Sequence, residues 1–128
     1  MAVWQYSFNL IPKTSTSINN IEDQIQEIFW ADFERDNTVI RFGSYDGNIC
    51  SAHIKNDSIS SLSCRLDMRV IDRETLKKVY EFAQVNNLTI IDLAQEKELL
   101  SKEEFLWAIK VCSWFRFVQD PVWFFENL

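Results

Sequence analysis

Hydrophobic and polar residues alternate along several short stretches of the chain, a period of two that is typical of strands with one buried face. The clearest alternation covers residues 62–70, where Leu, Cys, Met and Val occupy every second position. Asp46-Gly47 separates two other stretches and predicts a tight hairpin, because glycine adopts positive φ without strain. The five predicted strands cover residues 4–10, 39–42, 49–54, 62–70 and 88–93.

A second pattern, with apolar residues three and four positions apart, predicts three helices. The helices are expected to begin at the caps Asn19, Asp72 and Ser101 and to end near Phe33, Asn86 and Val118. Two of these starts have the spacing of a capping box, in which a polar side chain is followed three residues later by glutamate. The third helix is apolar on nearly every side, which indicates burial within the domain or against a partner.

The order of these elements, β-α-β-β-β-α-β-α, predicts an α+β fold built as a single domain over residues 1–128. Because the predicted strands have one apolar and one polar face, we expect a two-layer sandwich. It would contain a mostly antiparallel five-stranded sheet with the helices on one face. The apolar strand positions would form the core, and the polar positions an uncovered face of the sheet.

Composition changes this picture mainly through charge. The 128 residues include 13 Lys and Arg against 19 Asp and Glu, which gives a net charge of −6 and a pI near 4.7. This charge repels nucleic acid and favours a basic partner. The chain has neither a signal-peptide pattern nor an uncharged apolar run of about 18 residues. We therefore expect a cytoplasmic protein that binds neither nucleic acid nor a membrane.

Signatures of catalysis and metal binding are missing from the sequence. The single His and the three Cys do not have the spacing of a metal site, and the sequence contains no phosphate-binding loop and no hydrolase or protease motif. Cys50, Cys64 and Cys112 are interpreted as reduced apolar side chains. We expect no enzymatic activity, no catalytic residues, no metal and no cofactor.

The first predicted helix has an acidic stripe opposite its isoleucine residues. Asp23, Glu27, Trp30 and Glu34 follow one another at helical spacing, and Asp36 lies nearby in sequence. An exposed tryptophan surrounded by carboxylates suits contact with a basic protein surface, such as the cleft of a nuclease. The alternative is a solvated stripe with the tryptophan folded under the following loop. The five residues are the first candidate site, for partner binding.

A second candidate site lies on the polar face of the predicted sheet. Strand parity places Arg41, His53, Arg65 and Arg69 on this face. Arginine donates two parallel hydrogen bonds to carboxylate or phosphate, so the face is a candidate site for an anion. The alternative is a solvated face on which arginine and aspartate pair across strands. The same parity places Cys50 and Cys64 on the opposite face, away from the histidine.

Aromatic residues are concentrated near the C-terminus. They are Trp107, Trp114, Phe117, Trp123, Phe124 and Phe125. Such a concentration exceeds what one helix usually buries in a two-layer domain, and large exposed apolar patches are rare on monomers. We expect first that the segment completes the core. The second expectation is that it forms the interface of a homodimer or of a complex with a partner.

Two segments resemble small bacterial immunity proteins of polymorphic toxin and contact-dependent growth inhibition systems. They are WQYSFNLIP at residues 4–12 and SWFRFVQDPVWFF at residues 113–125. The resemblance covers the whole chain in style and size and assigns no residue roles. It implies a cytoplasmic protein that binds a cognate toxin domain, often a nuclease, and blocks its active site. The rival hypotheses are a small-molecule or anion-binding domain, which would use the polar sheet face, and a homodimeric structural protein.

Overall fold

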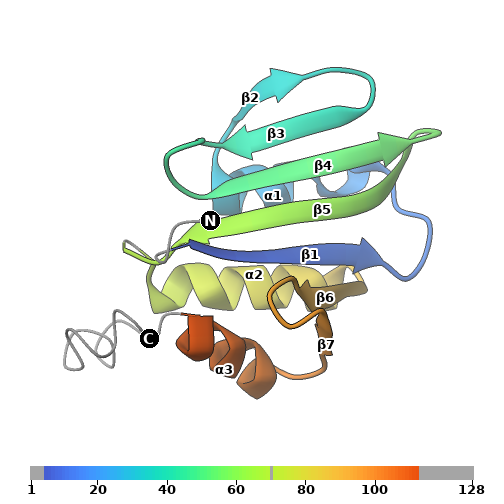
Figure 1. Cartoon of the computed structure of the whole chain (residues 1–128). Helices are drawn as coiled ribbons and strands as arrows, with labels where there is room; N and C mark the ends of the chain where they lie inside the picture. The colour runs from blue at the N-terminus through green and yellow to red at the C-terminus, as the bar shows by residue number, and fades with distance from the viewer. Residues whose placement is uncertain (1–4, 70, 113–128) are drawn as a thin grey trace.

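The computed structural model describes residues 5–69 and 71–112. Within this part of the chain, seven strands form one antiparallel sheet in the order β2-β3-β4-β5-β1-β6-β7 (Figure 1). The strands are β1 (Gln5–Pro12), β2 (Asp32–Arg35), β3 (Val39–Gly43), β4 (Ile49–Lys55), β5 (Ser58–Asp67), β6 (Leu88–Asp92) and β7 (Lys97–Leu99). The helices are α1 (Ile18–Phe29), α2 (Arg73–Val85) and α3 (Lys102–Cys112).

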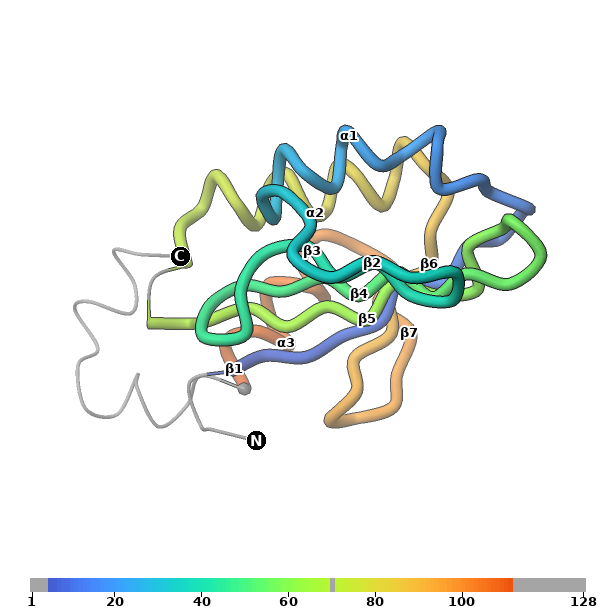
Figure 2. The backbone as a smooth tube through the Cα atoms, turned by 90° about the horizontal axis from the view of Figure 1, so that it is seen from above, coloured from blue at the N-terminus to red at the C-terminus, as the bar shows by residue number. Residues whose placement is uncertain are grey.

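Helices α1 and α2 form a layer against one face of the sheet, and α3 lies beside β1 and β7. Helices α1 and α2 contact each other and lie on the same side of the strands, as the view from above shows (Figure 2). Helix α1 contacts β3 and β4, whereas α2 contacts β6. Helix α3 contacts β1 and β7, and the ring of its Phe105 meets the rings of Tyr6, Phe8 and Tyr80. The predicted α+β architecture with an antiparallel sheet is therefore confirmed.

Strand parity determines the core, as the sequence predicts. Tyr6, Phe8 and Leu10 of β1 are each no more than 1% exposed, and alternate positions of the neighbouring strands are buried with them. These neighbours include Ile40, Phe42, Cys50, Ala52, Leu62, Cys64, Leu66 and Met68. Isoleucines of α1 at helical spacing pack onto the same cluster, which explains why this face of the helix turns inward.

The number of strands and their order differ from the prediction. Strand β2 occupies residues assigned to the end of the first helix, and β7 follows β6 as an additional short edge strand. Helix α1 ends at Phe29 rather than Phe33, because the next residue, Trp30, leaves the helical conformation with φ 83° and ψ −178°. The observed order is β-α-β-β-β-β-α-β-β-α.

Three local predictions also need correction. Helix α1 is capped by Ser17 rather than Asn19, since the Ser17 side chain accepts a hydrogen bond from the Asn19 N–H at 3.3 Å. The glycine with positive φ near the β3–β4 hairpin is Gly43, with φ 99°, and not Gly47. Strand β5 begins at Ser58 and ends at Asp67, four residues earlier than expected at its start.

Helix α3 begins where the sequence predicts. The Ser101 side chain accepts a hydrogen bond from the Glu104 N–H at 3.1 Å, which is one half of the expected capping box. The aromatic residues from Trp114 to Phe125, for which a dimer interface was one expectation, lie outside the described residues. No helix within the described part of the chain is long and apolar enough to span a membrane.

Candidate protein-binding surface

Trp30 lies at the junction between α1 and β2 in a strained conformation. Its N–H donates to the Gln26 carbonyl at 2.8 Å, which closes the last turn of the helix. Its φ of 83° and ψ of −178° fall in a region occupied almost only by glycine. The residue is nevertheless 77% exposed, so burial of the indole does not compensate for the strain. The backbone conformation at this position favours glycine, whereas the sequence has an exposed tryptophan there.

Gly43 allows the chain to pass close to this junction. The Gly43 N–H donates to the Ala31 carbonyl at 3.2 Å. A Cβ at Gly43 would lie 2.2 Å from the Asn48 carbonyl oxygen, and the φ of 99° also disfavours any other residue. Tyr45 follows two residues later. Trp30 and Tyr45 therefore leave the backbone at the same end of the β2–β3 pair.

Two further aromatic side chains meet beside this junction. The rings of Phe33 and Tyr45 form an edge contact with centroids 4.9 Å apart and planes at 68°. Phe33 is 41% exposed and Tyr45 is 58% exposed. The Tyr45 hydroxyl donates to Glu34 Oε2 at 2.7 Å, and this hydrogen bond raises the pKa of the phenol. We refer to Trp30, Phe33 and Tyr45 as the aromatic surface.

Ion pairs hold β2, the short edge strand that supplies Phe33. Arg35 pairs with Asp32 at 3.2 Å and also with Glu22 of α1, so the strand is tied to the helix. Glu34 Oε1 accepts from Arg41 of β3 at 2.7 Å. The hydrogen bond from Arg35 lowers the pKa of Asp32, which keeps this carboxylate ionised. Backbone pairing with β3 places the strand at the edge of the sheet, and the strand contributes little buried apolar surface.

The predicted acidic stripe is not continuous in the structure. Asp23 and Glu27 are exposed on α1, as expected, and Trp30 follows directly after the helix. Glu34 instead lies on β2, where it pairs with Arg41, and is not a continuation of the helical face. Asp36 closes the β2–β3 turn, since its carboxylate accepts from the Thr38 N–H and the Val39 N–H. The stripe fails beyond Trp30 because the helix ends there.

Turn formation also affects the charge of Asp36. The hydrogen bond from the Thr38 N–H lowers the pKa of this carboxyl group, with smaller contributions from the Thr38 hydroxyl and the Val39 N–H. The carboxylate is fully exposed, and its hydrogen bonds reach only residues two and three positions further along the chain. Asp36 therefore acts primarily as a turn residue whose negative charge faces solvent.

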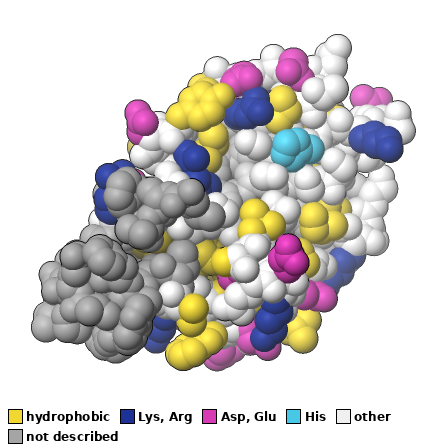
Figure 3. All heavy atoms as spheres, viewed as in Figure 1, with side chains coloured by type: hydrophobic (Ala, Val, Ile, Leu, Met, Phe, Trp, Pro, Cys, Tyr) yellow, Lys and Arg dark blue, Asp and Glu magenta, His cyan; other side chains and the backbone are white. Residues whose placement is uncertain are grey.

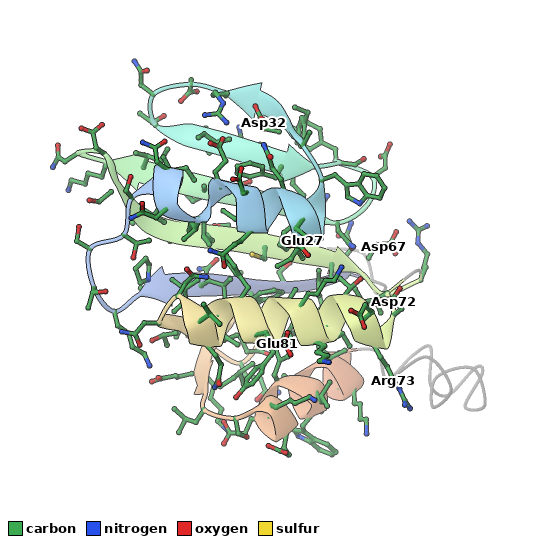
Figure 4. All side chains as sticks on the ribbon, turned by 180° about the vertical axis from the view of Figure 1, so that it is seen from behind. Glu27, Asp32, Asp67, Asp72, Arg73 and Glu81 are labelled. Atoms are coloured by element: carbon green, nitrogen blue, oxygen red, sulfur yellow. The ribbon has the colours of Figure 1, made fainter. Side chains whose placement is uncertain are left out.

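The helix-covered side of the molecule adds further carboxylates. Figure 4 shows Glu27 projecting from α1 and Glu81 from α2 on this side. The two residues line a shallow groove of 170 Å³ between the helices, together with Lys78. Negative charge on α1 thus extends to within three residues of Trp30, whereas the partner of Glu81 is Lys77 at 3.9 Å.

The second candidate site lies on the open face of the sheet, which Figure 3 shows as a largely uncharged polar surface with the single histidine in cyan. Arg41 pairs with Glu34, and Arg65 donates to the Tyr45 carbonyl. His53 Nε2 lies 3.1 Å from the Ser63 hydroxyl. The arginines of this face thus have protein partners, which lowers their availability for an anion.

Arg69 pairs with an aspartate of its own segment of the chain. It lies after the end of β5, and its guanidinium binds both oxygens of Asp67, at 3.0 and 2.8 Å. Asp67 is only 5% exposed, although it is two residues from Arg65 and so shares its parity along β5. The pairing of arginine with aspartate occurs here within one segment of the chain and not across strands.

The sequence pattern identified Trp30 but not Phe33 or Tyr45. Each of these two aromatics stands in a short polar stretch, and a large apolar residue in such a stretch is the only sequence signal that marks them. Their contact depends on the β2–β3 pairing and the following turn. Among the described residues, no group of three or more His, Cys, Asp or Glu side chains is arranged to hold a metal ion.

No protein-family model matches this chain, and comparisons with curated protein sequences and with solved structures found no significant similarity.

Proposed function

We propose that this chain is a non-enzymatic, immunity-type protein that binds a basic toxin domain through the aromatic surface. The observation that carries the proposal is the strained and exposed Trp30. Strained backbone persists only where surrounding structure enforces it, and it concentrates at functional positions. A tryptophan at such a position stabilises the fold less than a glycine would. We therefore assign the side chain a role in binding a partner.

The chemistry of the surface supports a protein as the ligand. Tryptophan and tyrosine are the residues most enriched among those that dominate binding energy at interfaces, where they bury large areas at low entropic cost. Trp30, Phe33 and Tyr45 are exposed by 77%, 41% and 58% and lie at one end of the β2–β3 pair. Exposed aromatic side chains of this kind typically form the centre of protein interfaces.

The charge of the chain supports a basic partner. Glu27 lies one turn before Trp30, and Asp23 lies one turn further along the exposed side of α1. The net charge of −6 adds a long-range field that raises the rate of encounter with a basic protein. The resemblance to immunity proteins names the class of that partner as a toxin domain, for which occlusion of a nuclease cleft is the simplest mode of neutralisation.

The first experiment is purification of the tagged chain from toxin-producing cells of its native host, with identification of co-purifying proteins by mass spectrometry. A basic toxin fragment at equal stoichiometry is expected. The purified complex is then compared for wild type, Trp30→Ala and Trp107→Ala. Trp107 is a matched control because it is 65% exposed on α3, away from β2.

Trp30→Ala should weaken binding by about 2 kcal/mol or more, and toxin activity should no longer be inhibited at equal concentrations. Trp107→Ala should leave both quantities unchanged. Equal affinity of the two variants would reject the aromatic surface. Failure of the wild-type chain to inhibit any co-purified basic protein would reject the immunity function itself.

A further inference from the structure

A groove of 350 Å³ lies between α2 and α3, away from the aromatic surface. Its apolar lining consists of Leu76, Tyr80, Phe105 and Leu106. Phe105 and Leu76 are buried, at 0% and 3% exposure, and belong to the main core. The base of the groove is therefore preformed by the fold, as is usual for sites that bind small molecules.

The helical period of α2 places apolar side chains on the wall of the groove. Leu76 and Tyr80 are separated by one turn and face the same side of the helix, toward α3. The ring of Tyr80 stacks on that of Phe105, with centroids 6.4 Å apart and an interplanar angle of 27°. This contact joins the two helices beside the apolar groove.

Three cationic residues surround the apolar lining. Arg73 and Lys77 belong to α2, and Lys102 is the first residue of α3. In Figure 4 the Arg73 side chain extends from the first turn of α2 toward the side on which α3 lies. Within residues 5–69 and 71–112, Lys77 makes only a long ion pair with Glu81, at 3.9 Å between exposed groups. Among the described residues, neither Arg73 nor Lys102 forms an ion pair.

Three cations around one groove contrast with the rest of this chain. The net charge is −6, and a random surface of this protein would carry more carboxylates than cations. The combination of an apolar floor with a cationic rim matches a ligand that has an apolar tail and an anionic head. A charged head would remain hydrated at the rim while the tail removes apolar surface of Leu106 and Tyr80 from water.

We propose that the α2–α3 groove binds a single-chain anionic amphiphile, a fatty-acid carboxylate. The alkyl chain lies between the helices on Leu76, Phe105 and Leu106, and the carboxylate contacts Arg73 and Lys102. The volume of 350 Å³ lies at the lower end of the range for small-molecule sites, about 300–1,000 Å³. The site is independent of the proposed partner surface.

The test is isothermal titration of the full-length chain with dodecanoate below its micelle concentration. Saturable binding with a stoichiometry of one is expected, and added salt should weaken it because the head group is partly exposed. Dodecyltrimethylammonium has the same tail with the opposite charge and should bind at least about tenfold more weakly. Absence of saturable dodecanoate binding, or equal binding of both amphiphiles, overturns the proposal.

Two variants separate the rim from the general charge of the protein. Lys102→Glu should weaken dodecanoate binding by about tenfold or more, since it replaces a cation at the head group with a carboxylate. Lys55→Glu makes the same change in net charge at the exposed β4–β5 hairpin and should leave the affinity unchanged. Equal affinities of these two variants overturn the assignment of the rim.

A third variant tests whether the alkyl chain lies in the α2–α3 groove. Leu106→Trp places a larger side chain at a partly buried position that lines the groove, and it should abolish dodecanoate binding. A urea unfolding curve like that of the wild type shows that the variant is folded. Wild-type affinity in a folded Leu106→Trp variant places the alkyl chain elsewhere and overturns the proposal.

Discussion

Replacing Trp30 with glycine should give a more stable protein than replacing it with alanine. Both changes remove the indole and the small part of it that is buried, so the comparison between them isolates the backbone. At φ 83° and ψ −178° an alanine keeps the strain of the wild type, whereas a glycine adopts the same conformation without it. The two variants therefore differ in strain and in the entropy of the unfolded chain.

The magnitude follows from these two terms. Strain in this region of φ and ψ costs about 1–3 kcal/mol for a residue other than glycine. Glycine loses more backbone entropy on folding than alanine, which costs about 0.5–1 kcal/mol. The free energy of unfolding of Trp30→Gly should thus exceed that of Trp30→Ala by about 1 kcal/mol. In urea this corresponds to a shift of the midpoint by roughly half a molar.

Trp107 provides the matched control, since it is an exposed tryptophan inside α3 with 65% of its surface accessible. At a regular helical position glycine is less stable than alanine by about 1 kcal/mol. The order of the two variants should therefore reverse between positions 30 and 107. Urea unfolding followed by far-ultraviolet circular dichroism measures all four variants without depending on tryptophan fluorescence.

The refuting result is a Trp30→Ala variant as stable as Trp30→Gly, or more stable. It would mean that the conformation at position 30 is not strained, and the argument from strain to function would fail. In binding experiments both Trp30 variants should lose the partner to the same extent, because both lack the indole. A glycine variant that is more stable and inactive separates the stability of the fold from the function of the surface.

Three further predictions concern the helix cap, the core and a buried thiol. Asp72→Ala should lower the free energy of unfolding by about 1 kcal/mol, since Asp72 accepts from the Thr75 N–H at 2.8 Å. This hydrogen bond lowers the pKa of Asp72, so its stabilising effect is present above about pH 4 and should be lost as the pH falls below it, as urea curves at several pH values would show. Ile25→Ala, at a residue with 0% exposure, should cost about 3 kcal/mol in the same assay; a loss under 1 kcal/mol would contradict its placement in the core. Burial raises the pKa of the Cys64 thiol, so stability should fall as the pH rises above about 8.5, where the unfolded chain ionises first; an unchanged alkaline slope in Cys64→Ala would contradict this.

The period-two pattern predicted the core of the sheet because each central strand has one buried face. Tyr6 and Phe8, for example, are buried, while the alternate residues Gln5 and Ser7 are only partly so. Register then follows, since a slip by one residue would expose the apolar side of β1. Cys50 and Cys64, predicted to lie on the inner face, are direct partners across β4 and β5.

The edge strands were not predictable by the same means. Strand β2 has no alternation, because three of its four side chains are charged, and it is attached to the sheet by backbone pairing with β3 rather than by burial of apolar side chains. The three residues of β7 are too few to show a period. The early start of β5 is set by Asn56 and Asp57, whose φ values of 53° and 63° form a tight turn. Local turn geometry, and not hydrophobic patterning, determines these boundaries.

The candidate surface shows the same division. The sequence left two readings of Trp30 open, an exposed side chain opposite the isoleucines of α1 or one folded under the following loop, and the structure has the exposed one, at 77%. The helical continuation to Glu34 was wrong, since nothing in the sequence marks position 30 as a residue with positive φ. Phe33 and Tyr45 are twelve residues apart and meet only because β2 pairs with β3. A surface assembled from a helix end, an edge strand and a turn has no periodic signature.

Sequences that specify a fold usually agree with it at every level, and disagreement concentrates at functional sites. In the α2–α3 groove each residue type suits its position, because the apolar floor is part of the core and the cations are solvated. Position 30 disagrees, since the conformation requires glycine and the residue is tryptophan. The two sites therefore respond differently to mutation. Replacing Trp30 with glycine should relieve the backbone strain while it weakens partner binding, whereas filling the groove at Leu106 should abolish dodecanoate binding with no gain in stability.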